Sequence, residues 1–338
     1  MCALEAPGGL TQAWHFEATG CRWVVYTRSP LPDTLREKVT ARVDAFEDVW
    51  SRFRTGSLMR RAAAVRVSHG PGGGRIVRGR HGEVVLELPP GSAALLDLYD
   101  RLHGATDGRI DPLAGADLVA LGYDAEYSFV VRDGAVHRLG ADHGRPTWAD
   151  TARHDGDRLV LHEPVLIDVG AAGKGFLADL LAAWLREDGR DEYLIDADGD
   201  LLVHCSEPVR IGLERPGAAS GGEGEVVGVV ELANGAVCAS GVSRRTWGPG
   251  LHHILDAHTG LPIQGMNAVI ATWAVAGSCA EADGLATALF VSDPAALAAA
   301  GFDYDFALLR ADGSAAVSRT WHDLPAELFT SSSPRRDR

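Results

Sequence analysis

Short apolar runs of strand length, with only a few helical patterns between them, are the feature that most limits the folds open to this chain. Together with a few amphipathic helices, such runs predict an α+β fold: one domain of mixed or antiparallel sheets with packed helices. Strands are predicted at Val165–Val169, Tyr193–Ile195, Leu201–Cys205, Val209–Leu213, Glu225–Leu232, Leu251–Leu255, Ala268–Val275 and Phe306–Leu309.

Apolar residues that recur at three- and four-residue steps indicate the amphipathic helices. One such helix is predicted at Asp33–Phe53, with its first residue as N-cap, and another at Gly91–His103, with Ser92 as N-cap. A further helix is expected to begin near Gly173 or Lys174, directly after the first predicted strand. The apolar face of the first helix consists of Leu35, Val39, Val43, Phe46 and Trp50.

Composition is that of a globular chain with a sizeable core, since 46% of the 338 residues are hydrophobic and 23% are charged. No linker demands a domain boundary, so we expect one domain over residues 1–330. The polar end, Ser331–Arg338, is expected to be disordered, and Ser220–Gly224 to form a hairpin loop or a small disordered insert. A net charge of -14 disfavours a nucleic-acid binder, which would carry a basic face.

Membrane insertion is not expected, because no stretch has the roughly 20 apolar residues that a spanning helix needs. The strongest apolar run, Leu177–Leu185, is shorter and contains Asp179. The first ten residues lack the basic and apolar regions of a secretory signal. We therefore expect a cytoplasmic protein.

The segment Leu166–Phe176 combines a carboxylate, Asp168, with a turn of small residues and the start of a helix. Small residues let a ligand approach the backbone, and a helix N-terminus favours an anion such as phosphate. Lys174 adds a positive charge. The order of residues is neither that of a P-loop nor that of a GxGxxG fingerprint, and a tight turn with a solvated lysine explains it equally well.

Two side chains that carry oxygen share one face of a predicted helix within Cys279–Phe290. Asp283 and Thr287 are four residues apart, so they lie one turn above each other. A carboxylate and a hydroxyl suit a hard cation such as Mg²⁺. Taken alone, an exposed carboxylate and a threonine bonded to its own helix explain the pattern better.

A histidine-rich turn, His252–Pro262, follows another predicted strand. His253 lies near a carboxylate, Asp256, and can serve as a general base. The spacing does not match a zinc motif such as HExxH, and a structural turn explains the glycine and proline. Aromatic residues in Leu121–Phe129 can stack on a planar ring, although core tyrosines are commoner.

Taken in chain order, these segments resemble the FAD:protein FMN transferase family, the ApbE-type flavin transferases. The resemblance runs from about Phe16 to Val291. Glu281–Leu289 resembles the family motif EADALATAL, and Ile167–Gly175 resembles IDLGGIAKG. Several motifs in the family's order are a much stronger signal than one. The other matching segments are Phe16–Trp23, Asp111–Pro112, Leu121–Asp124, Tyr193–Asp200, Ala239–Gly241, His253–Asp256 and Thr259–Pro262.

The resemblance implies an enzyme that uses Mg²⁺ to cleave FAD and attaches FMN through a phosphoester to a Ser or Thr hydroxyl of an acceptor flavoprotein. AMP is the expected second product, and the flavin is expected in a central cleft. The implied catalytic residues are His253, as the base, and Asp283. The implied magnesium ligands are Asp283, Thr287 and a backbone carbonyl, taken as that of Ala171. The residues expected to contact FAD are Thr19, Arg109, Ile110, Asp111, Asp168, Lys174 and Leu255.

Some positions depart from the family's pattern. Ala257 stands where the family has the proline of IDP, and Asp198 stands where a glycine is expected. Gly56 and Leu58 stand where polar side chains are common. A smaller, less polar wall near the pyrophosphate would alter the balance between transfer to protein and transfer to water. Two alternatives therefore stay open: a magnesium-dependent FAD pyrophosphatase, and an FAD-binding protein without turnover.

Overall fold

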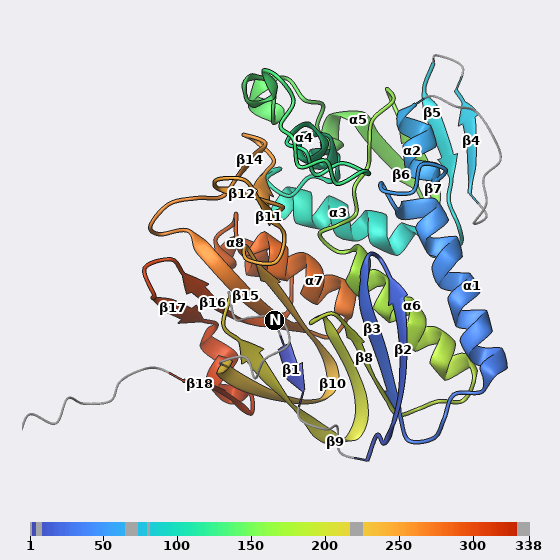
Figure 1. Ribbon diagram of the computed structural model, residues 1–338, viewed down its shortest axis with the longest axis vertical. Coiled ribbons are helices and arrows are strands. Elements are labelled where there is room, and N and C mark those ends of the chain that lie inside the picture. The colour runs from blue at the N-terminus through green and yellow to red at the C-terminus, as the bar shows by residue number, and fades with distance from the viewer. Residues whose placement is uncertain (1, 5–8, 65–73, 80–81, 217–225, 330–338) are drawn as a thin grey trace, which may run out of the picture.

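The computed structural model describes residues 2–4, 9–64, 74–79, 82–216 and 226–329, so the predictions for Ser220–Gly224 and Ser331–Arg338 lie outside the described residues. Figure 1 shows a large curved sheet with helices packed over it and a smaller sheet at the other end of the long axis. In the described part of the chain, no helix is both long and apolar enough to cross a bilayer.

The large sheet has ten strands, all paired antiparallel, in the order β17-β16-β15-β10-β9-β8-β3-β2, with β1 on β9 and β18 on β10. This arrangement confirms the predicted antiparallel α+β class. The strands are β1 Cys2–Leu4, β2 Gln12–Ala18, β3 Cys21–Thr27, β8 Tyr193–Ala197, β9 Leu201–Glu214, β10 Val226–Gly241, β15 Val269–Ala276, β16 Tyr304–Arg310, β17 Ala315–Val317 and β18 Ala326–Leu328.

The small sheet has four strands in the order β4-β5-β7-β6. Two further ribbons of paired strands, β11 with β12 and β13 with β14, lie on the chain between β10 and β15. These short strands are β4 Arg75–Arg78, β5 Val84–Glu87, β6 Ala152–Asp155, β7 Arg158–Leu161, β11 Thr246–Trp247, β12 Leu251–His252, β13 Leu255–Asp256 and β14 Leu261–Pro262.

The helices that matter most for the site are α6 and α7, which pack against each other and onto the large sheet (Figure 1). Leu177, Leu181 and Leu185 of α6 are fully buried, as is Leu285 of α7, and they belong to the main hydrophobic core. The helices are α1 Asp33–Trp50, α2 Leu58–Ala63, α3 Ala93–Ala105, α4 Gly115–Ala120, α5 Trp148–Thr151, α6 Gly173–Glu187, α7 Cys279–Ala288 and α8 Pro294–Ala299.

One predicted strand, Val165–Val169, is wrong, because these residues join no sheet. The segment is held by its backbone to a short turn instead, with the Asp168 amide donating to the Pro112 carbonyl at 2.8 Å. Its apolar residues, Ile167 and Val169, are nevertheless buried in the core. Burial of an unpaired segment therefore produced a strand-like pattern.

Other boundaries differ from the prediction for local reasons. The first helix ends at Trp50 instead of Phe53, and its N-cap position is held by Pro32. Ser92 occupies the N-cap position of α3 as predicted, but its side chain makes no capping hydrogen bond. That role falls to Asp157, whose carboxylate accepts from the Gly91 amide at 3.1 Å and the Ala93 amide at 2.7 Å.

Strand continuity also differs. The two runs predicted at Leu201–Cys205 and Val209–Leu213 form one strand, β9, whose partner β10 has register irregularities opposite it. The run predicted at Leu251–Leu255 is divided between β12 and β13.

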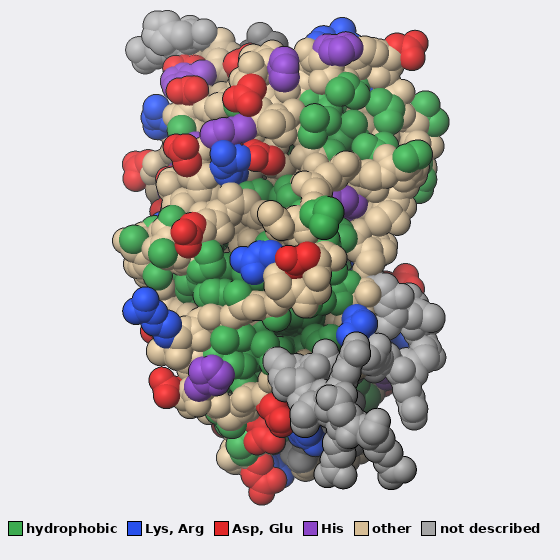
Figure 2. Space-filling view, turned by 90° about the vertical axis from the view of Figure 1, so that its left-hand side faces the viewer, with side chains coloured by type: hydrophobic (Ala, Val, Ile, Leu, Met, Phe, Trp, Pro, Cys, Tyr) green, Lys and Arg blue, Asp and Glu red, His purple; other side chains and the backbone are tan. Residues whose placement is uncertain are grey.

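The surface carries a mixture of side-chain types. On the face shown in Figure 2, Lys and Arg are interspersed with Asp and Glu, and hydrophobic side chains gather in the upper right part of the view. This mixture is ordinary for an acidic globular protein.

Candidate active site

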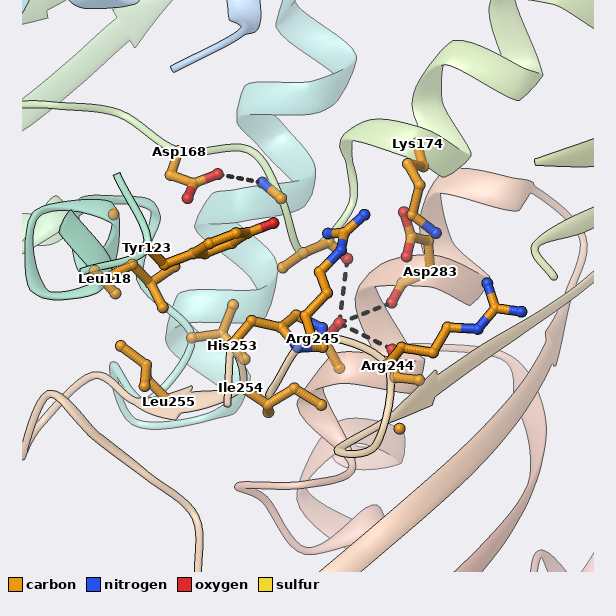
Figure 3. Close-up of a pocket in the computed structure, with 18 of the residues that line it drawn as sticks. Leu118, Tyr123, Asp168, Lys174, Arg244, Arg245, His253, Ile254, Leu255 and Asp283 are labelled. Carbon is orange, nitrogen blue, oxygen red and sulfur yellow. Dashed lines mark hydrogen bonds between the residues drawn. The ribbon is translucent and has the colours of Figure 1, made fainter. Parts of the chain in front are cut away.

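A cavity of about 640 Å³ is lined by segments that are far apart in the sequence. Its size is within the range of small-molecule and cofactor sites. Its walls come from the end of α1, the turn before α6, the end of β10 with the loop that follows, and α7. Figure 3 shows side chains from the last three of these segments, among them Asp168, Arg244 and Asp283, around one space.

Nearly every residue predicted for the site borders this cavity. The residues brought together are Arg109, Ile110, Asp111, Asp168, Ala171, Lys174, His253, Leu255, Asp283 and Thr287. Thr19 is the exception, since it borders a smaller pocket of about 220 Å³. Phe53, Tyr123, Arg244 and Arg245 border both pockets, so the two are neighbours.

The three residues predicted to hold a metal lie next to one another. The Thr287 hydroxyl oxygen is 3.4 Å from the Ala171 carbonyl oxygen and 3.4 Å from the carbonyl oxygen of Asp283. The Ser240 hydroxyl lies 3.5 Å from it on another side. The Asp283 carboxylate is buried and accepts from the Gly175 amide at 2.9 Å, which fixes its orientation.

This set of oxygen atoms suits a hard cation. Carboxylate, hydroxyl and carbonyl oxygens are the ligands that Mg²⁺ prefers, with water completing its shell. Burial raises the pKa of Asp283, and the nearby Lys174 ammonium opposes that rise. Among the described residues, no group of three or more His, Cys, Asp or Glu side chains is placed to hold a metal ion.

Basic side chains gather at the cavity even though the chain is acidic overall, with a net charge of -14. Most of them already have a carboxylate partner. The pairs are Arg52 with Asp168, Arg109 with Asp256, Lys174 with Asp200, and Arg244 with Asp198. Arg245 forms no ion pair within the part of the chain that the structure describes, and it extends between His253 and Asp283 (Figure 3). The cavity wall is therefore suited to a ligand with negative charge.

His253 lies on the loop between β12 and β13, and its Nδ1 is buried without a hydrogen-bond partner among the described residues. Burial, with the positive charge of Arg245 as the next cause, lowers the pKa of His253 to about 3. The imidazole is therefore neutral near pH 7, with a ring nitrogen able to accept a proton.

Asp111 borders the cavity, but its carboxylate is used to hold the chain. It accepts from the Leu113 amide at 2.7 Å and from the Trp148 amide at 3.0 Å, and it lies 3.6 Å from the Arg145 guanidinium. These donors give Asp111 a structural role, and its expected contact with FAD stays a prediction.

Sequence reasoning predicted Arg109 but missed the other arginines that line the cavity. Arg52 is 3% exposed and its guanidinium lies 4.0 Å from the centre of the Phe53 ring and 4.8 Å from that of Tyr123. Phe53 in turn stacks on Tyr127 with ring centres 5.2 Å apart. The aromatic residues of Leu121–Phe129, considered as a stacking surface from the sequence, therefore do stand at the two pockets.

The chain matches the sequence pattern of a known protein family. The sequence pattern of the ApbE family matches residues 18–304, which is most of the chain. The chain belongs to the ApbE family. The resemblance inferred from the motifs is thereby confirmed.

Several ApbE-family relatives carry the name FAD:protein FMN transferase. The one from Vibrio cholerae is 30% identical over 201 residues, which cover 56% of this chain and 58% of the relative. The one from Rhodobacter capsulatus is 31% identical over 215 residues, covering 61% and 39%. The one from Klebsiella pneumoniae is 25% identical over 276 residues, covering 78% and 72%. The chain thus spans less than two thirds of the first two relatives' length.

Solved ApbE structures share the fold. The flavin transferase ApbE from Vibrio cholerae superposes with a TM-score of 0.72 at 21% identity, over 93% of this chain and 98% of that one. The Pseudomonas stutzeri flavinyl transferase ApbE, in its apo form, gives 0.70 at 22% identity, over 94% and 97%. This likeness confirms the α+β arrangement over nearly the whole chain.

Proposed function

We propose that this ApbE-family protein is a flavin transferase that cleaves FAD, attaches FMN to a Ser or Thr hydroxyl of an acceptor flavoprotein and releases AMP. One observation carries the proposal: Asp283, Thr287 and the Ala171 carbonyl meet basic side chains in a single cavity. A pyrophosphate needs both kinds of group, since charge builds on its oxygens as it is cut. The names of the relatives point to the same reaction.

The basic wall binds and orients the two phosphates in this proposal. Lys174 lies in the first turn of α6, where the helix dipole also favours negative charge. Arg245 has no carboxylate partner within the described residues, so its full charge is available to the ligand. Phe53 and Tyr123 offer ring faces beside these charges, as a flavin or adenine ring requires.

Asp283, Thr287 and the Ala171 carbonyl are the residues that would hold Mg²⁺. When bound, the ion would neutralise charge on the pyrophosphate oxygens. The protein prepares this place by holding the Asp283 carboxylate with the Gly175 amide, so the ligand oxygen does not need to be reoriented.

His253 is the proposed base. As the acceptor hydroxyl oxygen forms its bond to the FMN phosphorus, the bond from phosphorus to AMP breaks and the hydroxyl proton passes to a ring nitrogen of His253. In the free protein the low pKa of about 3 makes His253 a weak base. The negative phosphates of bound FAD offset the charge of Arg245 and raise that pKa towards a useful value.

The deciding experiment follows both products of FAD cleavage. The protein is incubated with FAD, Mg²⁺ and an Asp-rich peptide that contains one Thr, with a Thr→Ala version of the peptide as the control. AMP release supports the transferase if flavin becomes attached to the Thr peptide and not to its Thr→Ala version. AMP with only free FMN would identify a pyrophosphatase, and bound FAD without AMP would identify a binding protein.

A further inference from the structure

The strongest apolar run of the chain, Leu177–Leu185, contains one charged residue, Asp179. This residue lies on α6, and its carboxylate accepts hydrogen bonds from the Cys279 amide and the Ala280 amide, each at 2.9 Å. Those amides are the first two of α7, and the first amides of a helix find no acceptor within their own helix. Asp179 therefore caps α7 from a neighbouring helix and ties the N-terminal end of α7 to α6.

A second contact joins the same two helices in the opposite direction. The Gly175 amide of α6 donates to the Asp283 carboxylate of α7 at 2.9 Å. Gly175 precedes Asp179 by four residues, so both lie on one face of α6. Cys279 precedes Asp283 by the same number of residues, so both lie on one face of α7. Each helix thus supplies a carboxylate that backbone amides of the other helix hold, and these contacts together form an α6–α7 clamp.

The backbones of α6 and α7 approach each other closely within the clamp. A Cβ at Gly175 would collide with the Cys279 carbonyl. Further along α7, a Cβ at Gly284 would lie 3.6 Å from that of Ala172, the residue at the N-cap position of α6. Figure 1 shows the two helices side by side. Closely packed elements are placed by their direct contacts, so the clamp sets where α7 lies relative to α6.

The proposed magnesium ligands are divided between the two sides of the clamp. The Ala171 carbonyl belongs to the turn before α6, whereas Asp283 and Thr287 lie on α7. The Thr287 hydroxyl oxygen is 3.4 Å from the Ala171 carbonyl oxygen, and a shift of α7 along α6 would change this distance. Mg²⁺ demands a near-ideal octahedral arrangement of its ligands. The relative placement of the two helices therefore decides how well these oxygens fit the ion.

We propose that Asp179 is a positioning residue for magnesium, which fixes the distance between the two ligands on α7 and the Ala171 carbonyl before α6. The inference rests on the metal site of the proposed function and adds a residue that lies behind that site. Asp179 does not border the cavity that the described residues enclose, so it acts through α7 and not on the bound ligand. Groups that orient metal ligands contribute to metal affinity even where they do not touch the ion.

Ser278 offers a matched control at the same end of α7. Its hydroxyl accepts from the Glu281 amide at 3.1 Å, and it occupies the N-cap position of the helix itself. Loss of either cap destabilises α7, because amides in the first turn lose their acceptor. Only loss of the Asp179 cap also loosens α7 from α6. Asp179 and Ser278 therefore share the capping role and differ in the link between the helices.

The test compares Asp179→Asn with Ser278→Ala and the unmodified protein. Magnesium affinity is measured by calorimetric titration of the protein without FAD, and the melting temperature is measured in a metal chelator. Asparagine keeps the size of the side chain but loses the charge and one acceptor oxygen. We expect Asp179→Asn to weaken Mg²⁺ binding by about tenfold, the lower end of the loss caused by removing a group that orients a ligand. Both variants should melt at a lower temperature, and Ser278→Ala should bind Mg²⁺ normally.

Hydrogen exchange in the unmodified protein provides a second measurement that does not depend on the folding of a variant. If the clamp favours metal binding, metal binding stabilises the clamp in return. Added Mg²⁺ should therefore slow exchange at the Cys279 and Ala280 amides more than at the Glu281 amide, which is capped within α7. Equal slowing at all three amides would show that the ion stabilises α7 alone, and would overturn the inference.

Equal Mg²⁺ affinity in Asp179→Asn and the unmodified protein would overturn the inference. The same loss of affinity in Asp179→Asn and Ser278→Ala would overturn it too, since general weakening of α7 would explain both. If the unmodified protein binds no Mg²⁺, the metal site of the proposed function fails along with this inference. Weaker binding in Asp179→Asn alone upholds the inference even if the peptide assay shows no flavin transfer.

Discussion

The Nε of Arg52 donates to the Asp168 carboxylate at 2.5 Å across a separation of 116 residues. The same guanidinium donates through Nη1 to the Tyr123 carbonyl at 2.7 Å. Arg52 therefore joins the end of α1 to the segment before α6 and to the aromatic side of the cavity. One buried side chain thus holds together three parts of the wall.

We predict that Arg52→Met destabilises the protein by about 3 kcal/mol, the lower end for a broken buried pair, because it leaves the Asp168 carboxylate, which is 15% exposed, without its charged partner. Urea unfolding would measure the change. Arg42→Met is the control, since Arg42 pairs with Glu187 at 3.0 Å on the surface and such a pair contributes about 1 kcal/mol or less. Equal losses of unfolding free energy in the two variants would contradict a larger contribution from the Arg52 pair than from a surface pair.

Asp283→Asn is expected to abolish the magnesium dependence of FAD cleavage while leaving the fold intact. The amide keeps an oxygen for the Gly175 amide but removes the charge that a cation needs. The loss of activity should exceed about 100-fold, the upper figure for residues that only support a ligand. The rate of AMP formation from FAD would be measured over a range of Mg²⁺ concentrations. Glu281→Gln, on the same helix, should behave normally, and full activity of Asp283→Asn at micromolar Mg²⁺ would contradict the assignment.

His253→Ala should slow flavin transfer far more than it weakens FAD binding. General bases contribute about 10²–10⁴-fold to a rate, so the turnover number should fall by an amount in this range. Turnover measurements and a separate FAD titration distinguish the effect on the rate from the effect on FAD binding. His258→Ala is the control, because His258 is bonded to the Asp107 carbonyl and does not line the cavity. Rate and affinity falling by the same factor would remove His253 as the base.

The low pKa of His253, about 3, has a consequence for acid stability. Below about pH 6.5 the unfolded chain protonates this histidine, whereas the folded protein does so only near pH 3. The unfolded state therefore binds more protons between these values, and the free energy of unfolding falls as the pH drops. We predict that His253→Gln flattens this fall. Unfolding curves from pH 7 to pH 4, without FAD or metal, would test it, and parallel curves for both proteins would refute it.

Gly175→Ala is expected to harm both stability and metal binding. A Cβ at this position would collide with the Cys279 carbonyl, which lies where α6 meets α7. Overpacking of this kind costs about 1–3 kcal/mol, and any shift of α6 moves the amide that holds Asp283. Gly104→Ala, in α3 with open space around the new methyl group, should be neutral or stabilising. Calorimetric melting and Mg²⁺ titration of both variants would check the contrast.

The fold class could be predicted from the sequence because periodicity depends on which face of an element is buried. The pattern located α1, α3 and α6 and five of the ten strands of the large sheet, β8, β9, β10, β15 and β16, with errors at their ends. It could not show that β9 and β10 are long continuous strands, since register irregularities such as the one near Leu232 depend on pairing with another strand. It also could not separate the buried but unpaired Val165–Val169 from a true strand.

The site was predictable where short motifs carry the chemistry. Asp283, Thr287 and Ala171 were assigned through the family's motifs, because two oxygen-bearing side chains on one helix face do not by themselves distinguish a metal site from an exposed carboxylate. Arg52 and Arg245 were missed because an arginine in a sequence gives no sign of being turned inwards by distant partners. The structural bonds of Asp111 could not be predicted, because one of its backbone donors, Trp148, comes from a remote segment.

The ion pairs that Lys174, Arg52, Arg109 and Arg244 form with carboxylates of the protein affect how readily a bound ligand is released. A polyanion that enters this cavity displaces the carboxylates that already pair with these basic side chains. Its net attraction is the difference between its own interaction with the cations and that of the carboxylates. Product departure then restores the original pairs instead of exposing bare charge. Release of a bound polyanion therefore costs less than it would if all of these cations lacked carboxylate partners.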